Sequence, residues 1–217
     1  MPAQPLLLTS EFLVVGEGDG DAAFVTHLCT ARGIAGYQIE DCRGESKFVL
    51  SLTSLSSRTG YDRLKGILVV SDNDDAPDAN FLKIRGYLKD TKKLPAPEKP
   101  LTPVKRDTIT VAVMMLPYEA GKASRGCLET LLLKSIQPAQ QETIDCIKTF
   151  RSCIDGSDRP KSHEDKFKLR CFIAAKYPDD PNLALSFAVS PSKGLFDFGH
   201  SCFDEVSDFL KKFPGLC

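Results

Sequence analysis

The sequence contains few of the residues that small proteins most often use for structural metal sites or nucleophilic catalysis. In 217 residues there is no tryptophan, there are only three histidines, and no two of the eight cysteines form a C-x-x-C pair. Structural zinc sites and disulfide-stapled domains both need closely spaced ligands or cysteines, so we expect free thiols and neither kind of site. The absence of a G-x-S-x-G segment leaves hydrolysis by a serine nucleophile of that type without support.

Long apolar runs and an excess of charge of one sign are also missing. No run approaches the ~18 apolar residues of a membrane-spanning helix, and residues 1–15 lack the basic segment of a secretory signal. We therefore expect a cytoplasmic protein with no membrane contact. The 28 lysines and arginines nearly balance the 29 aspartates and glutamates, for a net charge of -1, which excludes a globally basic protein that coats nucleic acid but leaves a local basic face open.

The first half of the sequence alternates between apolar strand patterns and helical patterns. Runs typical of strands lie at 11–15, 37–40, 66–70 and 108–116, and the first three are each followed by a helical pattern. Near-continuous valine, isoleucine and leucine in the strands predicts a mostly parallel sheet with helices on both faces. We predict a Rossmann-like α/β domain over residues 1–116, in which 91–107, with four prolines, forms a Pro/Lys-rich surface loop.

After residue 117 the pattern becomes helical. Helices are predicted at 127–135, 139–153, 164–177 and 202–213, separated by turn signals. We therefore expect a C-terminal helical extension over 117–217, packed on the α/β domain.

Acidic side chains follow two of the predicted strands, at the point where each strand ends. They are Glu17, Asp19 and Asp21 after the first strand, and Asp72, Asp74, Asp75 and Asp78 after the third. In an open α/β sheet, ligands bind at the carboxyl ends of the strands. Carboxylates crowded there repel one another unless a cation lies between them, and hard oxygen ligands suit Mg²⁺ or Mn²⁺. The alternative is that these residues serve in turns and helix caps, and Asp21 in particular could cap the following helix.

Three familiar motifs share residues with these acidic loops. GEGDG at 16–20 has G-x-G-x-G spacing instead of the G-x-G-x-x-G of dinucleotide-binding loops, and its carboxylates would repel a pyrophosphate. DNDDAPD at 72–78 has Pro77 where a calcium-binding loop of this kind needs its turn glycine. A strand followed by D-x-D is also typical of haloacid-dehalogenase-type phosphatases; this alternative stays open, although Ala76 stands where threonine or valine is usual.

Taken in order along the chain, two of these segments resemble a known domain. Residues 17–21 match an E-G-x-x-D motif between a strand and a helix, and residues 72–74 match a D-x-D motif after a later strand. This order is similar to the Toprim domain of topoisomerases, primases and OLD-family nucleases. The sequence also resembles a family of small prokaryotic Toprim-like proteins, over most of the chain, through the segments IEDCRGESKF, LVVSDNDDA, MMLPYEAGKASRGCLETLLL and FDFGHSCFDEVSDFL.

The resemblance implies a metal-dependent phosphodiester-cleaving enzyme, a nuclease acting on nucleic acid in defence or repair, with Mg²⁺ or Mn²⁺ as its cofactor. It places the catalytic roles on Glu17, as general base or metal ligand, and on Asp72 and Asp74, as metal ligands. It implies Asp21 and Glu129 as further metal ligands, although Glu129 could instead complement the first turn of a helix. The alternatives are a non-catalytic or regulatory Toprim-like module that works with a partner protein, and the phosphatase.

A basic segment follows the second acidic loop. Residues 81–107 hold eight lysines and arginines against three acids, a local charge of +5. A phosphate backbone could run over this segment while its scissile group meets the metal. The candidate nucleic-acid contacts are Lys83, Arg85, Lys89, Lys92 and Lys93. The alternative is a solvated helix and loop. The cations Lys166, Lys168 and Arg170 are either phosphate contacts or the polar face of their helix, and we favour the second interpretation.

Overall fold

A five-stranded sheet forms the centre of the structure, a computed structural model that describes residues 7–44, 47–119, 121–154 and 159–217. Its strands are β1 (Phe12–Gly16), β2 (Tyr37–Asp41), β3 (Gly66–Asp72), β4 (Val104–Arg106) and β5 (Ile109–Leu116). The strand order is β2-β1-β3-β5-β4, and only the edge strand β4 runs antiparallel to its neighbour. The predicted mixed α/β class with a mostly parallel sheet is therefore confirmed.

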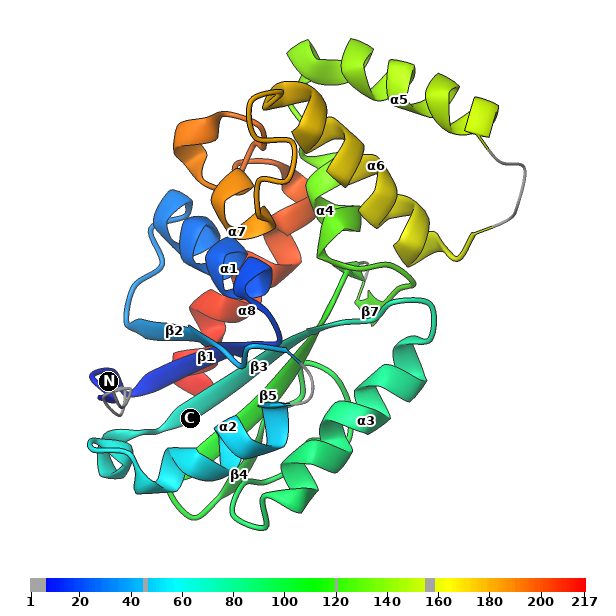
Figure 1. The fold of residues 1–217 in the computed structure, drawn as a ribbon. Helices are drawn as coiled ribbons and strands as arrows, with labels where there is room; N and C mark the ends of the chain where they lie inside the picture. Colours follow the sequence, from blue (N-terminus) through cyan, green and yellow to red (C-terminus); the bar gives the residue numbers. More distant parts are fainter. Residues whose placement is uncertain (1–6, 45–46, 120, 155–158) are drawn as a thin grey trace, which may run out of the picture.

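Helices cover both faces of this sheet (Figure 1). They are α1 (Asp19–Ala31), α2 (Phe48–Ser54), α3 (Pro77–Asp90), α4 (Leu128–Lys134), α5 (Gln141–Ile154), α6 (Lys161–Lys176), α7 (Leu185–Ala188) and α8 (Asp204–Lys212). Helices α2 and α3 lie on one face, whereas α1, α4, α6, α7 and α8 lie on the other. Helix α5 is outermost and packs on α6. None of the helices in the described ranges has the length and apolar character that crossing a membrane would need.

Each face of the sheet has its own hydrophobic core, because successive side chains of a strand point to opposite sides. In β3, Leu68 and Val70 belong to the core beneath α1, α4 and α8, whereas Ile67 and Val69 belong to the core beneath α2 and α3. All four side chains are fully buried. A strand buried on both faces has a continuous apolar sequence, which is why this strand could be predicted.

The segment after residue 117 completes the first of these cores. Phe172 of α6 and Leu210 of α8 are fully buried there beside Met114 of β5. The helices predicted at 127–135, 139–153, 164–177 and 202–213 correspond to α4, α5, α6 and α8. Because this core draws on both halves of the chain, the division into a domain over 1–116 and an extension over 117–217 stays a prediction.

The structure differs from the predictions in two short segments. Residues 91–107 are not wholly a loop, because Val104–Arg106 pairs with β5 as the antiparallel strand β4. Three residues are too few to show a period-two pattern, so the prolines around them dominate the sequence signal. A small hairpin of β6 (Tyr118–Glu119) and β7 (Lys122–Ala123) was not predicted for the same reason. Glu45, Ser46 and Ala120, which belong to the segments of the family resemblance, lie outside the described residues.

Candidate functional site

The two predicted acidic loops lie side by side because their strands are neighbours in the sheet. Gly16 of β1 pairs with Val70 of β3, and the Glu17 N–H donates to the Val70 carbonyl at 3.0 Å. Glu17 therefore leaves β1 close to the end of β3, where Asp72 stands. A small pocket of about 40 Å³ forms there, lined by Glu17, Ser71, Asp72, Asp74, Asn80, Lys83 and Ile84. The three residues predicted to be catalytic thus line one pocket, which we call the acidic pocket.

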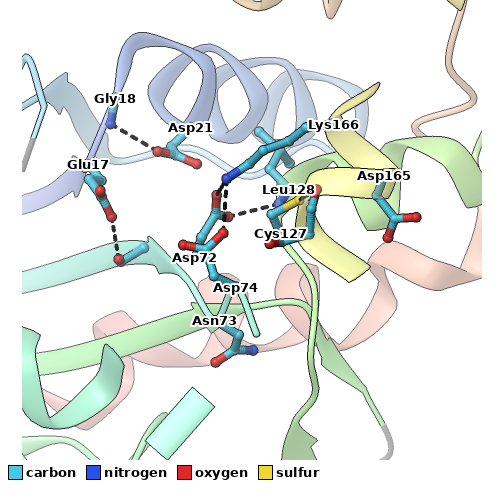
Figure 2. Close-up of polar contacts among 12 residues, drawn as sticks. Glu17, Gly18, Asp21, Asp72, Asn73, Asp74, Cys127, Leu128, Asp165 and Lys166 are labelled. Atoms are coloured by element: carbon cyan, nitrogen blue, oxygen red, sulfur yellow. Dashed lines mark hydrogen bonds and ion pairs between the residues drawn. The ribbon is translucent and has the colours of Figure 1, made fainter. Parts of the chain in front are cut away.

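Two further acidic residues approach the acidic pocket from α1 and α4. A carboxylate oxygen of Glu129, in the first turn of α4, lies within 4.8 Å of ligand atoms of both Asp72 and Cys127. Asp21 on α1 interacts through its charge with Glu17, Glu129 and Asp72. Figure 2 shows its carboxylate on the same side of α1 as Asp72. Of the five predicted metal ligands, Glu17, Asp72 and Asp74 thus share the pocket, and Glu129 lies close to Asp72, whereas Asp21 is linked to them only through its charge. Cys127 was missed, because nothing in the sequence marks a lone cysteine as the spatial neighbour of an aspartate so far from it.

Hydrogen bonds to single oxygens orient the two carboxylates at the centre of the site. Ser71 Oγ donates to Glu17 Oε2 at 2.6 Å, and the Leu128 N–H donates to Asp72 Oδ1 at 2.8 Å (Figure 2). The second donor belongs to the start of α4, so α4 itself positions the first aspartate of the D-x-D motif. In each case the second carboxylate oxygen takes no part in that hydrogen bond.

Burial and crowding raise the pKa values of two carboxyl groups. The pKa of Asp21 rises from 3.8 to about 7, mainly because the carboxyl group is buried. The Gly18 N–H donates to this carboxylate at 2.9 Å and lowers the pKa, whereas the charges of Glu17 and Glu129 raise it further. The pKa of Asp72 is also well above its ordinary value, first because of burial and then because of Asp21 and Glu129. Near neutral pH, protons therefore offset part of the negative charge. The bond to Gly18 also makes Asp21 a cap of α1, so the capping interpretation is confirmed, whereas its role as a metal ligand stays a prediction.

A lysine from α6 supplies a positive charge inside the acidic cluster. Lys166 Nζ lies 2.9 Å from Asp74 Oδ1 and 3.9 Å from Asp72 Oδ2, and its side chain reaches toward both aspartates in Figure 2. Burial alone would lower the pKa of Lys166, but the hydrogen bond to Asp74 and the charges of both aspartates outweigh burial and raise it. The interpretation of Lys166 as part of a merely solvated helix face is therefore wrong. Helical periodicity identifies a face but cannot say which distant residues that face meets.

Asp75, the residue after the D-x-D motif, fixes the start of the helix that carries this lysine. The N–H and Oγ of Ser162, on the first turn of α6, donate to the two carboxylate oxygens of Asp75 at 3.1 and 2.6 Å. These bonds lower the pKa of Asp75 although its partial burial acts in the opposite direction. Lys166 lies one turn further along α6, so the β3–α3 loop positions both the aspartates and their counter-ion.

The same loop is tied to the segment that leads into α4. Asp74 has φ +44°, a left-handed conformation that is uncommon outside glycine, although aspartate is among the residues that adopt it most readily. Its carbonyl accepts the Gly126 N–H at 2.7 Å, while the side-chain amide of the fully buried Asn73 donates to the Pro117 carbonyl at 2.7 Å. These bonds hold the D-x-D aspartates against the start of α4.

Of the predicted nucleic-acid contacts, only Lys83 lines the acidic pocket. The four that lie elsewhere are Arg85, Lys89, Lys92 and Lys93. Arg85 forms an ion pair with Glu98, and Lys93 Nζ donates to Ser56 Oγ at 2.7 Å. Lys89 and Lys92 line a different pocket at the far end of α3. Of the remaining acids of the two loops, Asp19 accepts a hydrogen bond from Ser186 and Asp78 is exposed on the first turn of α3.

The fold and the site together define a mixed α/β protein with an acidic cluster at the carboxyl edge of its sheet. The chain belongs to the family described as protein of unknown function (DUF3226), whose sequence model matches residues 10–214. Among solved structures it is similar to the C-terminal region of the Xanthomonas campestris pv. campestris OLD protein, with 13% identity, a TM-score of 0.44, and coverage of 97% of this chain and 98% of that chain. No curated protein matches the sequence.

Proposed function

We propose that this protein is a Toprim-like, metal-dependent phosphodiester-cleaving enzyme that acts on nucleic acid. The observation that carries the proposal is that Glu17, Asp72 and Asp74 line one small pocket, with Glu129 close to Asp72 and the charge of Asp21 acting on both Asp72 and Glu129. The pKa values of Asp21 and Asp72 are raised first by burial and then by the charges of the neighbouring acids, which shows that these carboxyl groups lie close together in a partly buried place. One lysine, Lys166, and partial protonation offset only part of this negative charge, so the binding of a further cation is the best explanation of the cluster.

The donor atoms suit a small, hard divalent ion. Glu17, Asp72, Asp74 and Glu129 offer carboxylate oxygens, which are the ligands that Mg²⁺ and Mn²⁺ prefer. Cys127 is a softer donor, but burial and the nearby acids raise the pKa of its thiol, which favours the neutral form. When bound, the ion supplies Lewis-acid stabilisation of a phosphodiester and lowers the pKa of a water molecule.

The chain itself supplies a proton acceptor and a positive charge. Glu17 is held by Ser71 through Oε2, which leaves Oε1 to accept a proton from the attacking water. Lys166 carries a positive charge beside the aspartates and is placed to contact a non-bridging phosphate oxygen once a substrate is present. Lys83 lines the same pocket and offers a further cation for an anionic substrate.

The size of the acidic pocket favours a polymeric substrate that lies across the surface. A volume of about 40 Å³ accepts an ion and part of a phosphoryl group, but it does not enclose a small-molecule phosphate ester. The rest of the substrate therefore binds outside the pocket, as a nucleic-acid backbone would.

The test is cleavage and binding measured in parallel, with single- and double-stranded DNA and RNA, in Mg²⁺, Mn²⁺ or chelator. Asp72→Asn and Asp74→Asn should abolish metal-dependent cleavage and keep the fold, because they remove ligand charge without removing volume. Asp78→Asn is the matched control: the same change on a nearby exposed aspartate that does not line the pocket should cut like the wild type. A phosphomonoester substrate included in the same assay separates nuclease from phosphatase.

The second candidate is a regulatory Toprim-like module that works with a partner protein. The observation that favours it is the exposed apolar surface of the outermost helix α5, where Phe150 is 51% and Ile154 is 45% exposed. Wild-type protein that takes up metal, yet neither cuts nor binds any nucleic acid, would contradict the nuclease proposal and favour this module.

A further inference from the structure

A second pocket lies at the opposite edge of the sheet, and among the described residues that line it every charged side chain is basic. It has a volume of about 630 Å³ and is lined by Lys89, Lys92, Leu94, Pro95, Ala96, Val104, Lys105 and Arg106. We call it the basic pocket. Asp90 and Asp107, which adjoin these cations in the sequence, do not line it. Helix α3 connects the two pockets, and its 14 residues span about 20 Å.

Three cations of the basic pocket are not neutralised by the protein. Within the described ranges, Lys89, Lys92 and Arg106 form no ion pair with a carboxylate. Arg106 Nη1 donates to the Lys92 carbonyl at 3.2 Å, which ties β4 to the end of α3 and holds the two walls of the pocket together. Lys105 differs, because its Nζ donates to the Cys217 carbonyl at 2.5 Å.

The backbone at Lys92 determines where its side chain leaves the end of α3. Lys92 follows the C-cap residue Thr91 of α3 and has φ +58°, the left-handed conformation for which glycine is strongly preferred at this position. The helix dipole favours a cation in the last turn and so accounts for Lys89, but a glycine would fit position 92 with less strain. The lysine at this position places a third cation beside Lys89 and Arg106, and among the described residues none of the three has a carboxylate partner.

We propose that the basic pocket binds phosphate groups, as an anion site separate from the acidic pocket. Lys89, Lys92 and Arg106 contact the phosphate oxygens, and the buried Leu94 and Pro95 form an apolar floor for an attached sugar or base. The phosphates belong either to a nucleic-acid strand that runs along α3 from the acidic pocket or to a free nucleotide. Only the first source rests on the proposed function. A span of 20 Å corresponds to about six nucleotides at 3.4 Å each.

The first experiment uses inorganic pyrophosphate in chelator, so that no metal or cleavage is involved. Its binding is followed by amide chemical shifts and by calorimetry at low salt. Pyrophosphate should shift the amides of residues 89–94, 96 and 104–106, and Lys92→Gly and Arg106→Gln should each weaken binding about fivefold. Lys92→Gly should melt at the same temperature as the wild type or higher, because glycine relieves the positive φ. Lys211→Gln, an equal charge change at an exposed position of α8, should bind like the wild type.

The second experiment distinguishes the two sources of phosphate. Oligothymidylates of 4 and 12 nucleotides are compared in chelator, with pyrophosphate as competitor. If the 12-nucleotide strand binds the wild type much more tightly than the 4-nucleotide strand, but binds Lys92→Gly with nearly the same affinity as the shorter strand, the phosphates belong to a nucleic-acid strand. If length makes no difference to affinity, they belong to a free nucleotide. The proposal is overturned if pyrophosphate leaves the amides of the basic pocket unmoved, or if Lys92→Gly and Arg106→Gln bind it like the wild type. Asp72→Asn should not change pyrophosphate binding, so failure of the nuclease proposal remains a separate result.

Discussion

Lys166 on α6 donates a hydrogen bond at 2.9 Å to Asp74, a residue 92 positions earlier in the chain. The same ammonium group lies 3.9 Å from Asp72, so one lysine offsets the charge of both aspartates in the D-x-D motif. A divalent ion bound to these carboxylates would compete with the lysine. If the proposed metal binds, its binding and the position of Lys166 should therefore be coupled.

The first prediction concerns this competition. Lys166→Met keeps the apolar stem of the side chain and removes its charge. In chelator the free energy of unfolding should fall by only about 1 kcal/mol, because the side chains of Lys166 and Asp74 are 40% and 42% exposed and solvent screens their attraction. Mg²⁺ should then raise the melting temperature of the variant more than that of the wild type, since no ammonium group competes with it. Lys166→Arg, which keeps the charge, is the control. An equal Mg²⁺ effect on Lys166→Met and wild type would show that the lysine and the metal do not share ligands.

The second prediction concerns pH. The pKa of Asp21 rises from 3.8 to about 7 in the folded protein, chiefly through burial, and that of Asp72 is also raised. Between pH 3.8 and 7 the folded state therefore binds more protons than the unfolded state. In chelator, the contribution of these two groups to the free energy of unfolding should be greatest below about pH 4. It should fall as pH rises toward 7, by about 1 kcal/mol per pH unit for each titrating group. Urea denaturation at a series of pH values measures this slope.

Two comparisons identify the groups responsible for the pH effect. Asp21→Asn should flatten the slope, because an amide oxygen can still accept the Gly18 N–H but cannot ionise. Saturating Mg²⁺ should also flatten it, because a bound cation keeps the carboxylates ionised in the folded state. A slope that persists in Asp21→Asn with Mg²⁺ present would assign it to other residues.

The sequence predicts those parts of the molecule that depend on local pattern or on strand order. β3 has a continuous apolar run, and the acids that follow β1 and β3 meet because these strands are adjacent in the sheet. Glu17 and Asp72 therefore fall at the same edge, as a parallel sheet requires. Their positions follow from topology, whereas their roles stay predictions.

The residues that the sequence did not predict depend on contacts between distant elements. Lys166 and Cys127 meet the D-x-D aspartates only because α4 and α6 pack over the edge of the sheet, and no local pattern encodes that packing. β4 escaped prediction because Val104–Arg106 is too short to show a period. Likewise, the basic segment looks continuous in sequence, but α3 separates Lys83 from Lys92 and carries them to different pockets.

The third prediction concerns the turn that leads into α4. Gly126 has φ +137°, and a Cβ there would lie 2.4 Å from Thr130 Oγ1. That oxygen accepts the Cys127 N–H at 3.0 Å and donates to Asp165 Oδ2 at 2.6 Å, so it links α4 to α6. Gly126→Ala should therefore lower the free energy of unfolding by about 2–3 kcal/mol, measured by urea denaturation. Gly86→Ala is the control: a Cβ at Gly86 meets nothing within 4 Å, and alanine should stabilise the interior of α3 by about 0.5–1 kcal/mol.

The fourth prediction separates the residue that positions Lys166 from the residues that bind metal. Asp75→Ala removes two hydrogen bonds, at 3.1 and 2.6 Å, from the first turn of α6. The free energy of unfolding should fall by about 1–2 kcal/mol at pH 7. These bonds lower the pKa of Asp75 in the folded state. The stabilisation by Asp75 is therefore fully present above its ordinary pKa of 3.8 and is lost as pH falls through the lower folded value. In acid, the wild type and the variant should thus have similar free energies of unfolding.

Metal binding tells the two roles apart. Asp75 holds α6 and is not a ligand in the proposed site, so Asp75→Ala should still gain stability from Mg²⁺, whereas Asp72→Asn should lose most of that gain. The double variant Asp75→Ala with Lys166→Met should be less destabilised than the sum of the two single variants, because Asp75 acts in part by placing the lysine. Additive effects would mean that the start of α6 and the lysine contribute independently. An Asp75→Ala protein that no longer responds to Mg²⁺ would instead make Asp75 part of the metal site.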